Sequence, residues 1–335
     1  MHDELEPLEP GEGMAMYVES REDELAARSL DLHEKHLQKF VEWCSAEGIR
    51  NMNDVTGRTI HQYRMSLKRE YAMSTISIHL STIRQFTRFC ESIDAVHEGV
   101  AEKIDLPGRT AQARDEKLEA DEADEILSYL RKYHYASRSH ALLSLLWHTG
   151  LRVGTVRALD VDDFDKERER LRIRHRPETG TPLKNKDAAE RYVALSPDVT
   201  DVIADYIEEY RHDVTDAHGR RPLFTTRNGR PVNNTLRRNV WAVTRPCKTG
   251  RECPHNRDIE RCDGAGRTND AAKCPSSVSP HPVRRGSITH HLRKDVPEKV
   301  VSDRANVSGK VLDRHYDRRT ESEKMEKRRS FISNL

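Results

Sequence analysis

The sequence has no excess of either charge, a modest apolar content and no long apolar run. Its 57 basic and 56 acidic residues leave a formal net charge of +1, so affinity for nucleic acid would have to come from local basic faces. No run approaches the roughly 18 apolar residues of a membrane-spanning helix, and the acidic N-terminus lacks an apolar signal segment. We therefore expect a cytoplasmic protein with no membrane association. Its 335 residues suggest two globular domains.

Four of the six cysteines lie in a segment, residues 246–276, that is rich in glycine, proline and asparagine. They are Cys247, Cys253, Cys262 and Cys274. Four thiolates suit a tetrahedral Zn²⁺ ion, which can order a segment with too few apolar residues to fold alone. The C-x5-C, C-x8-C and C-x11-C spacings match no tight zinc knuckle, so free thiols and disulfides remain alternatives. We favour a structural zinc ion over a catalytic one, because four thiolates leave no open position.

Composition and periodicity divide the chain into a tail, two domains and a linker. Residues 1–20 are acidic and predict a disordered tail. Residues 21–108 carry apolar residues at helical spacing and predict a helical domain, and the charged residues 109–117 predict a linker. Residues 118–335 mix helical patterns with two strands, the first of which alternates basic and apolar residues. We therefore expect a mainly α fold with a small antiparallel sheet (α+β).

A set of chemically suited side chains lies in the second domain. His281 and Arg284 are three residues apart at an expected helix start, so both project from one end of that helix. Arg152 follows an apolar helix that ends at Gly150, a residue typical of helix C-termini. Lys184 lies in the expected hairpin, and Tyr316 lies in a basic stretch near the C-terminus. Arginines grip phosphate, tyrosine can attack it, and histidine and lysine can transfer protons. The set therefore indicates attack on a phosphodiester.

The order and separation of these residues resemble those of the tyrosine recombinases of the phage-integrase family. The matching motifs are Thr149-Gly150-Leu151-Arg152, the hairpin lysine, His281-Pro282-Val283-Arg284 and Tyr316. The cysteine-rich insertion and the sequence Asp313–Asp317 are most similar to archaeal members. The resemblance implies that residues 21–108 form a core-binding domain and residues 118–335 form the catalytic domain.

This resemblance also implies a mechanism and partners. Tyr316 would form a 3′-phosphotyrosyl link to DNA while Arg152 and Arg284 hold the phosphate. His281 would take the tyrosine proton, and Lys184, with Lys186 as the alternative, would protonate the leaving 5′-oxygen. No cofactor would be needed for catalysis. The partners would be double-stranded DNA in the nucleoid and a homotetramer that holds two DNA sites. Phosphate contacts would come from basic faces that contain Arg84, Arg88 and Arg172.

One position departs from the family pattern. The family usually has a histidine or tryptophan about nine residues before the nucleophile, and this chain has Asn306 and Val307 there. Asn306 can donate a hydrogen bond to a phosphate oxygen, whereas Val307 cannot. Two alternatives therefore stay open. One is a type IB topoisomerase-like enzyme, which shares the chemistry but rejoins the same strand, and the other is a non-catalytic, zinc-containing DNA-binding regulator.

Overall fold

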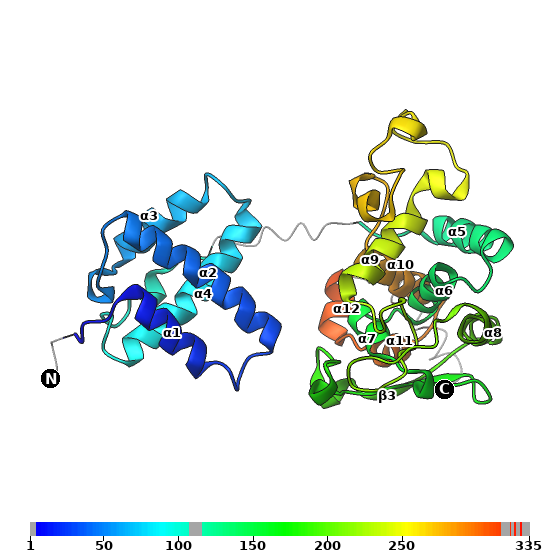
Figure 1. The fold of residues 1–335 in the computed structure, drawn as a ribbon, viewed down its shortest axis with the longest axis horizontal. Coiled ribbons are helices and arrows are strands. Elements are labelled where there is room, and N and C mark those ends of the chain that lie inside the picture. The colour runs from blue at the N-terminus through cyan, green and yellow to red at the C-terminus, as the bar shows by residue number, and fades with distance from the viewer. Residues whose placement is uncertain (1–4, 107–115, 316–321, 323–324, 326–328, 330–335) are drawn as a thin grey trace. The chain divides into compact units, whose positions relative to one another are not determined.

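The computed structural model describes residues 5–106, 116–315, 322, 325 and 329. The chain divides into two compact units, Met1–Ala113 and Arg114–Leu335, which Figure 1 shows with their helices labelled. The linker predicted at residues 109–117 falls almost entirely outside the described residues. Each unit is described below by itself.

The first unit is a bundle of four α-helices around an aromatic core. Within it, the ring of Phe40 packs edge-on against Tyr63 and Phe86, with centroids 5.0 and 6.3 Å away. The third helix starts where Thr56 and Thr59 form a reciprocal capping box. The helices are α1 (Pro10–Ser20), α2 (Ala27–Ala46), α3 (Gly57–Leu67) and α4 (Met73–Ser92).

The prediction of a disordered tail over residues 1–20 is wrong for its larger part. Residues 10–20 form α1, which begins with a proline at a position where the missing N–H costs nothing. Tyr17 is 1% exposed, and its ring packs edge-on against Phe86 and Phe89 at 5.7 Å in both cases. The acidic composition was misleading because this helix is held by apolar residues far away in the sequence. Residues 1–4 lie outside the described residues.

The second unit is built around α6, whose side chains are buried on nearly all sides. This helix packs against α5, α8, α9 and α10, as Figure 1 shows. The helices are α5 (Ala120–Tyr133), α6 (Arg138–Thr149), α7 (Val153–Ala158), α8 (Pro197–Asp205) with a π-helical turn (Tyr206–Tyr210), α9 (Asn233–Thr244), α10 (Pro280–Arg293), α11 (Glu298–Ala305) and α12 (Gly309–His315).

A three-stranded antiparallel sheet interrupts the helices between α7 and α8. Its strands are β1 (Phe164–Asp165), β2 (Arg170–Ile173) and β3 (Arg191–Ala194), in the order β1-β2-β3. Leu171 pairs with Val193, so both face the core. This sheet confirms the predicted fold class, which is mainly helical with a small antiparallel sheet. None of the described helices is both long and apolar enough to cross a lipid bilayer.

Candidate active site

A tight corner between α6 and α7 positions Arg152. Gly150 ends α6 with φ +63°, a left-handed conformation that glycine adopts without a Cβ clash. The Thr149 hydroxyl accepts a hydrogen bond from the Leu151 N–H at 3.3 Å. Arg152 then stands at the N-cap position of α7 and is half-buried. The Thr-Gly-Leu-Arg sequence is therefore a backbone turn that aims one arginine away from a buried helix.

The start of α10 carries two more residues of the predicted set, His281 and Arg284. Ser279 is its N-cap and Pro280 its first residue, an arrangement that suits helix initiation. His281 is exposed, whereas Arg284, one turn later, is 3% exposed. The three-residue spacing places both on one side of α10, as the sequence predicted.

Three arginines hold three consecutive carbonyl groups where α11 ends. Arg191 donates to the Arg304 carbonyl from Nε and Nη2, at 3.2 and 2.9 Å. Arg284 donates to the Ala305 carbonyl at 2.7 Å and also to the Gly150 carbonyl. Arg152 donates to the Asn306 carbonyl at 3.0 Å. The last carbonyls of a helix have no partner within it and carry partial negative charge. This end of α11 therefore gathers guanidinium groups from three separate elements.

Asn306 joins the hairpin that carries Lys184 to the end of α11. It has φ +50° in the left-handed region, which asparagine tolerates better than most residues. Its Oδ1 accepts a hydrogen bond from Nδ2 of Asn185 at 3.0 Å. The next residue, Val307, is 6% exposed and packs in a hydrophobic cluster with Ile288 and Leu312. The departure from the family pattern thus consists of a polar turn residue followed by a core residue.

The surroundings of His281 favour its neutral form. Loss of hydration in the dense packing around the start of α10 lowers its pKa below the usual value. The positive charges of Arg285, Arg284, Arg152 and Lys184 lower the pKa further. Lys184 is therefore the hairpin lysine whose charge acts on His281. Three of the other predicted catalytic residues, Arg152, Lys184 and Arg284, thus lie within electrostatic reach of His281.

The fifth predicted residue, Tyr316, lies outside the described residues. The backbone of α12 is described up to His315. This helix follows α11 after the turn at Asn306, and it packs against α11. The continuously described segment 116–315 therefore ends one residue before the predicted nucleophile.

Sequence reasoning missed Arg191 and Asn185. Arg191 begins β3, and burial together with the charges of Arg284, Arg152 and Arg304 lowers its pKa to about 10. It is held by carbonyls, since Nη1 also donates to the Ala189 carbonyl at 2.6 Å. The sequence signal for Arg191 was its position at the start of a strand in which buried and exposed residues alternate. That signal indicates a strand but not a contact with a helix more than a hundred residues away.

The predicted DNA-binding arginines occupy exposed or half-buried positions. In the first unit, Arg84 is half-buried on α4, and Arg88 is exposed with its guanidinium 3.5 Å from Glu102. In the second unit, Arg172 is exposed on β2. Its neighbours on the expected basic stretch are paired, Arg170 with Asp165 and Arg174 with Asp163. Among the three arginines of residues 170–174, Arg172 is thus the one that is exposed on β2.

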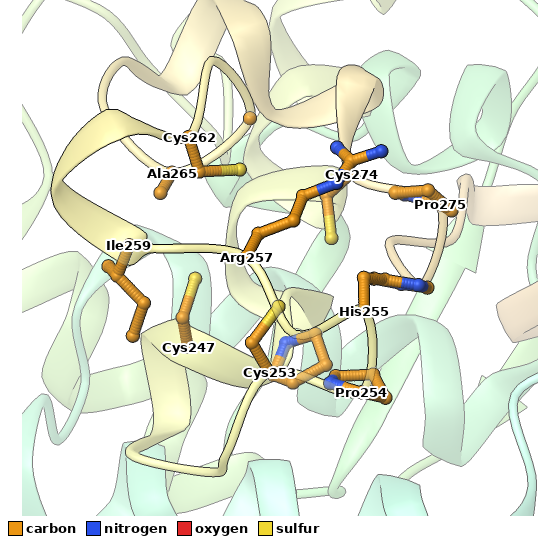
Figure 2. A pocket seen from close by; sticks show the side chains of 12 residues that line it. Cys247, Cys253, Pro254, His255, Arg257, Ile259, Cys262, Ala265, Cys274 and Pro275 are labelled. Carbon is orange, nitrogen blue, oxygen red and sulfur yellow. The ribbon is translucent and has the colours of Figure 1, made fainter.

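The four cysteines of the insertion line one small cavity away from the arginine cluster. Figure 2 shows the sulfurs of Cys247, Cys253, Cys262 and Cys274 directed toward a common space. All six cysteines of the chain are free thiols, and Cys44 and Cys90 are buried in the first unit. Within the described part of the chain, no three side chains of His, Cys, Asp or Glu are arranged closely enough to hold a metal ion. The expected disulfide alternative is therefore absent, and a zinc ligand set is not preformed.

Comparison with known families identifies the chain. Residues 116–316 match the model of the phage integrase family, and residues 19–92 match the N-terminal SAM-like domain of phage integrases. The chain belongs to the phage integrase family. The resemblance inferred from the Thr-Gly-Leu-Arg and His-Pro-Val-Arg motifs is thereby confirmed, and so is the class of activity, because tyrosine recombinases are DNA strand-exchange enzymes.

Relatives of this phage integrase family member are recombinases. The tyrosine recombinase XerD of Corynebacterium glutamicum is 24% identical over 289 residues, 83% of each chain. XerD of Bifidobacterium longum is 22% identical over 83% of this chain and 82% of its own. Among solved structures, the Tn1549 transposon integrase in complex with circular intermediate DNA has a TM-score of 0.68 at 13% identity, over 95% of this chain and 98% of its own. A lambda integrase dimer bound to a core site has 0.62 at 14%, over 94% and 96%. These structures share the fold.

Proposed function

We propose that this chain is a site-specific tyrosine recombinase that cleaves and rejoins DNA through a 3′-phosphotyrosyl intermediate formed by Tyr316. The convergence of Arg152 and Arg284 on the end of α11 carries the proposal. Two guanidinium groups meet there, and their charges and that of Lys184 act on His281. The chain continues from this point through α12 toward the tyrosine.

Each residue has one role in the transesterification. Arg152 and Arg284 bind the non-bridging oxygens of the scissile phosphate and stabilise the charge that develops there. The phenolic oxygen of Tyr316 attacks phosphorus and gives its proton to His281, which the surrounding positive charges keep neutral. The bond to the 5′-oxygen breaks, and Lys184 protonates that oxygen. The phosphodiester is replaced by a phosphotyrosyl ester, and attack by a 5′-hydroxyl reverses the step.

The carbonyls of α11 orient the arginines before DNA arrives. A guanidinium group has five N–H donors in a fixed plane. When the Asn306 carbonyl accepts a hydrogen bond from Arg152, the plane of the guanidinium group is fixed relative to the end of α11. Preorganised donors of this kind need no reorganisation during the reaction, which is why they contribute strongly to rate.

Asn306 takes over part of the role of the missing histidine. Its Oδ1 is bound to Asn185, which leaves Nδ2 as the donating side of the amide. One hydrogen bond from Nδ2 to a phosphate oxygen supplies a neutral donor at this corner. An amide cannot add the positive charge of a protonated histidine, so we expect slower cleavage than in a site that has the histidine.

Double-stranded DNA is the proposed partner, bound through basic faces that contain Arg84, Arg88 and Arg172. This proposal is supported by the likeness in fold to the Tn1549 transposon integrase in complex with circular intermediate DNA and to the lambda integrase dimer bound to a core site. Strand exchange between two sites requires four active tyrosines, so the active assembly is a homotetramer on two duplexes. Its place is the cytoplasm at the nucleoid. We assign a structural zinc ion to the cysteine cluster.

A covalent trapping assay tests the proposal. The protein is incubated with a nicked suicide duplex that carries its site, obtained by selection from random DNA, and a denaturant-resistant adduct is measured. We expect an adduct with the natural chain and none with Tyr316→Phe, while both bind the site equally. Site-specific binding without an adduct would instead support a DNA-binding regulator. An adduct without pairing of two sites would support a topoisomerase-like enzyme.

A further inference from the structure

The cavity shown in Figure 2 is lined by four thiols that approach it from different turns. Cys247 lies in the turn Pro246–Thr249, which follows α9, and Cys253, Cys262 and Cys274 come from later parts of the insertion. The space between them is about 20 Å³. A cavity of this size holds one water-sized or ion-sized occupant and excludes an organic ligand.

The backbone around Cys262 is shaped so that two of these cysteines can approach each other. A Cβ on Gly264 would lie 2.9 Å from the backbone nitrogen of Cys274, so only glycine fits. The Ala265 N–H donates to the Cys262 carbonyl at 2.9 Å and closes the turn that carries this cysteine. Arg245, 5% exposed, donates to the Gly264 carbonyl and fixes the turn against the end of α9.

The insertion has little else to hold it in place. From Cys247 to Cys274, a segment described throughout, Ala271 is the buried hydrophobic residue. The regular structure there consists of three short 3₁₀ turns. No disulfide crosses the segment. A segment with this composition needs a cross-link, and a structural zinc ion provides roughly 10–16 kcal/mol of apparent binding free energy in small metal-dependent folds.

We propose that Cys247, Cys253, Cys262 and Cys274 bind one structural Zn²⁺ ion. Four thiols lose four protons on binding and become the tetrahedral ligands of one ion. The sulfurs line the cavity but in the described chain they are not close enough together to form a ligand set, so binding of the ion requires them to move inward. His255 also lines the cavity, but its Nε2 is engaged with the Ser276 hydroxyl at 2.8 Å. The four thiolates fill every coordination position of the ion, so this site takes no part in the strand-exchange reaction.

Metal content per chain tests the assignment directly. The full chain is purified from zinc-replete cells and analysed by elemental and native mass spectrometry. We expect one zinc per chain, none in a Cys262→Ser/Cys274→Ser variant, and one in the matched Cys44→Ala/Cys90→Ala control. His255→Ala should also retain one zinc. Iron in place of zinc, zinc that survives the double serine variant, or zinc lost from His255→Ala would overturn the four-cysteine zinc site.

A second measurement on the unaltered chain keeps the proposal testable if the serine variant fails to fold. The insertion carries exposed trypsin sites, including Arg261, whose side chain is 89% exposed. Removing zinc with a chelator should raise cleavage within residues 247–274 by tenfold or more, and zinc but not magnesium should reverse the effect. Helical circular dichroism should stay unchanged. Equal cleavage with and without chelator, in a chain that holds no zinc, would overturn the proposal.

Discussion

At the scale of single residues, the site depends on arginines whose partners are backbone carbonyls. Carboxylate partners would neutralise a guanidinium group, whereas a carbonyl orients it and leaves its charge in place. Arg174 and Arg176 in the same unit are paired with the buried carboxylate of Asp163 and serve the fold. Arg152, Arg191 and Arg284 donate hydrogen bonds to the backbone carbonyls at the end of α11.

Replacing Arg191 with lysine tests the importance of this arrangement. Lysine cannot make the two parallel bonds to the Arg304 carbonyl. Loss of about 1.5–3 kcal/mol of charged hydrogen bonding should slow single-turnover cleavage by roughly 10- to 100-fold. DNA affinity should stay within twofold, because Arg191 acts by positioning α11.

The control for this substitution is Arg168→Lys, an exposed arginine on the turn before β2 that pairs with Asp165. It should leave both cleavage and binding unchanged. An equal loss of affinity and cleavage rate in Arg191→Lys would mean that Arg191 itself contacts DNA and is not a positioning residue.

A histidine pair in the first unit makes stability sensitive to acid. The rings of His36 and His79 lie with their centroids 3.8 Å apart and are tilted by 32°. Burial, with the nearby His79 and His33, lowers the pKa of His36 to about 4. Between pH 4 and about 6.5 the unfolded chain therefore binds more protons than the folded one. The unfolding free energy should fall as the pH drops through this window, by at most about 1.4 kcal/mol per pH unit for this residue.

Urea unfolding measured at several pH values will show the effect. His36→Gln, which can still bond to Thr82, should flatten the pH dependence. His97→Gln, at an exposed position, should leave it unchanged. A pH dependence identical in all three proteins would show that His36 is not kept neutral by folding.

At the scale of elements, the position of α10 is set by one close contact. A Cβ on Gly286 would lie 2.0 Å from the Leu118 carbonyl oxygen and 2.8 Å from the Trp147 ring. The Leu118 N–H also donates to the Pro282 carbonyl at 3.2 Å. The segment before α5 thus lies directly against the helix that carries His281 and Arg284.

Gly286→Ala should therefore destabilise the second unit by roughly 1–3 kcal/mol, because the helix has to move away from its neighbours. The matched control is Gly154→Ala in α7, where nothing lies within 4 Å of an added Cβ. That change should be neutral or stabilising by up to about 1 kcal/mol. Thermal unfolding of both variants measures the difference, and equal midpoints would contradict the close contact.

Elements set by local signals could be predicted from the sequence, whereas those held by distant contacts could not. The end of α6 at Gly150 follows from the glycine itself, which takes the left-handed conformation there, and this prediction is confirmed. α1 was missed because Tyr17 packs against Phe86 and Phe89. Arg191 and Asn185 were missed because their partners lie 113 and 121 residues away. No local pattern carries such information.

At the scale of the whole molecule, the basic residues are distributed over both units while the net charge stays at +1. Binding to DNA should therefore be steeply salt-dependent even though the chain as a whole is nearly neutral. Arg88→Ala should reduce the slope of log affinity against log salt by about 1. Arg261→Ala, in the insertion, should leave it unchanged. Equal slopes in fluorescence-anisotropy titrations of the natural chain and Arg88→Ala would remove Arg88 from the interface.

The two ends of the cysteine insertion lie close together, and this has a consequence for how the fold can vary. The Thr244 hydroxyl at the end of α9 accepts a hydrogen bond from the Val278 N–H at 3.0 Å, so the chain leaves and returns at nearly the same point. The spacing between α9 and α10 is therefore independent of the number of residues that lie between them. We expect insertions and deletions within residues 246–276 to change the surface of the molecule but not the register of α10.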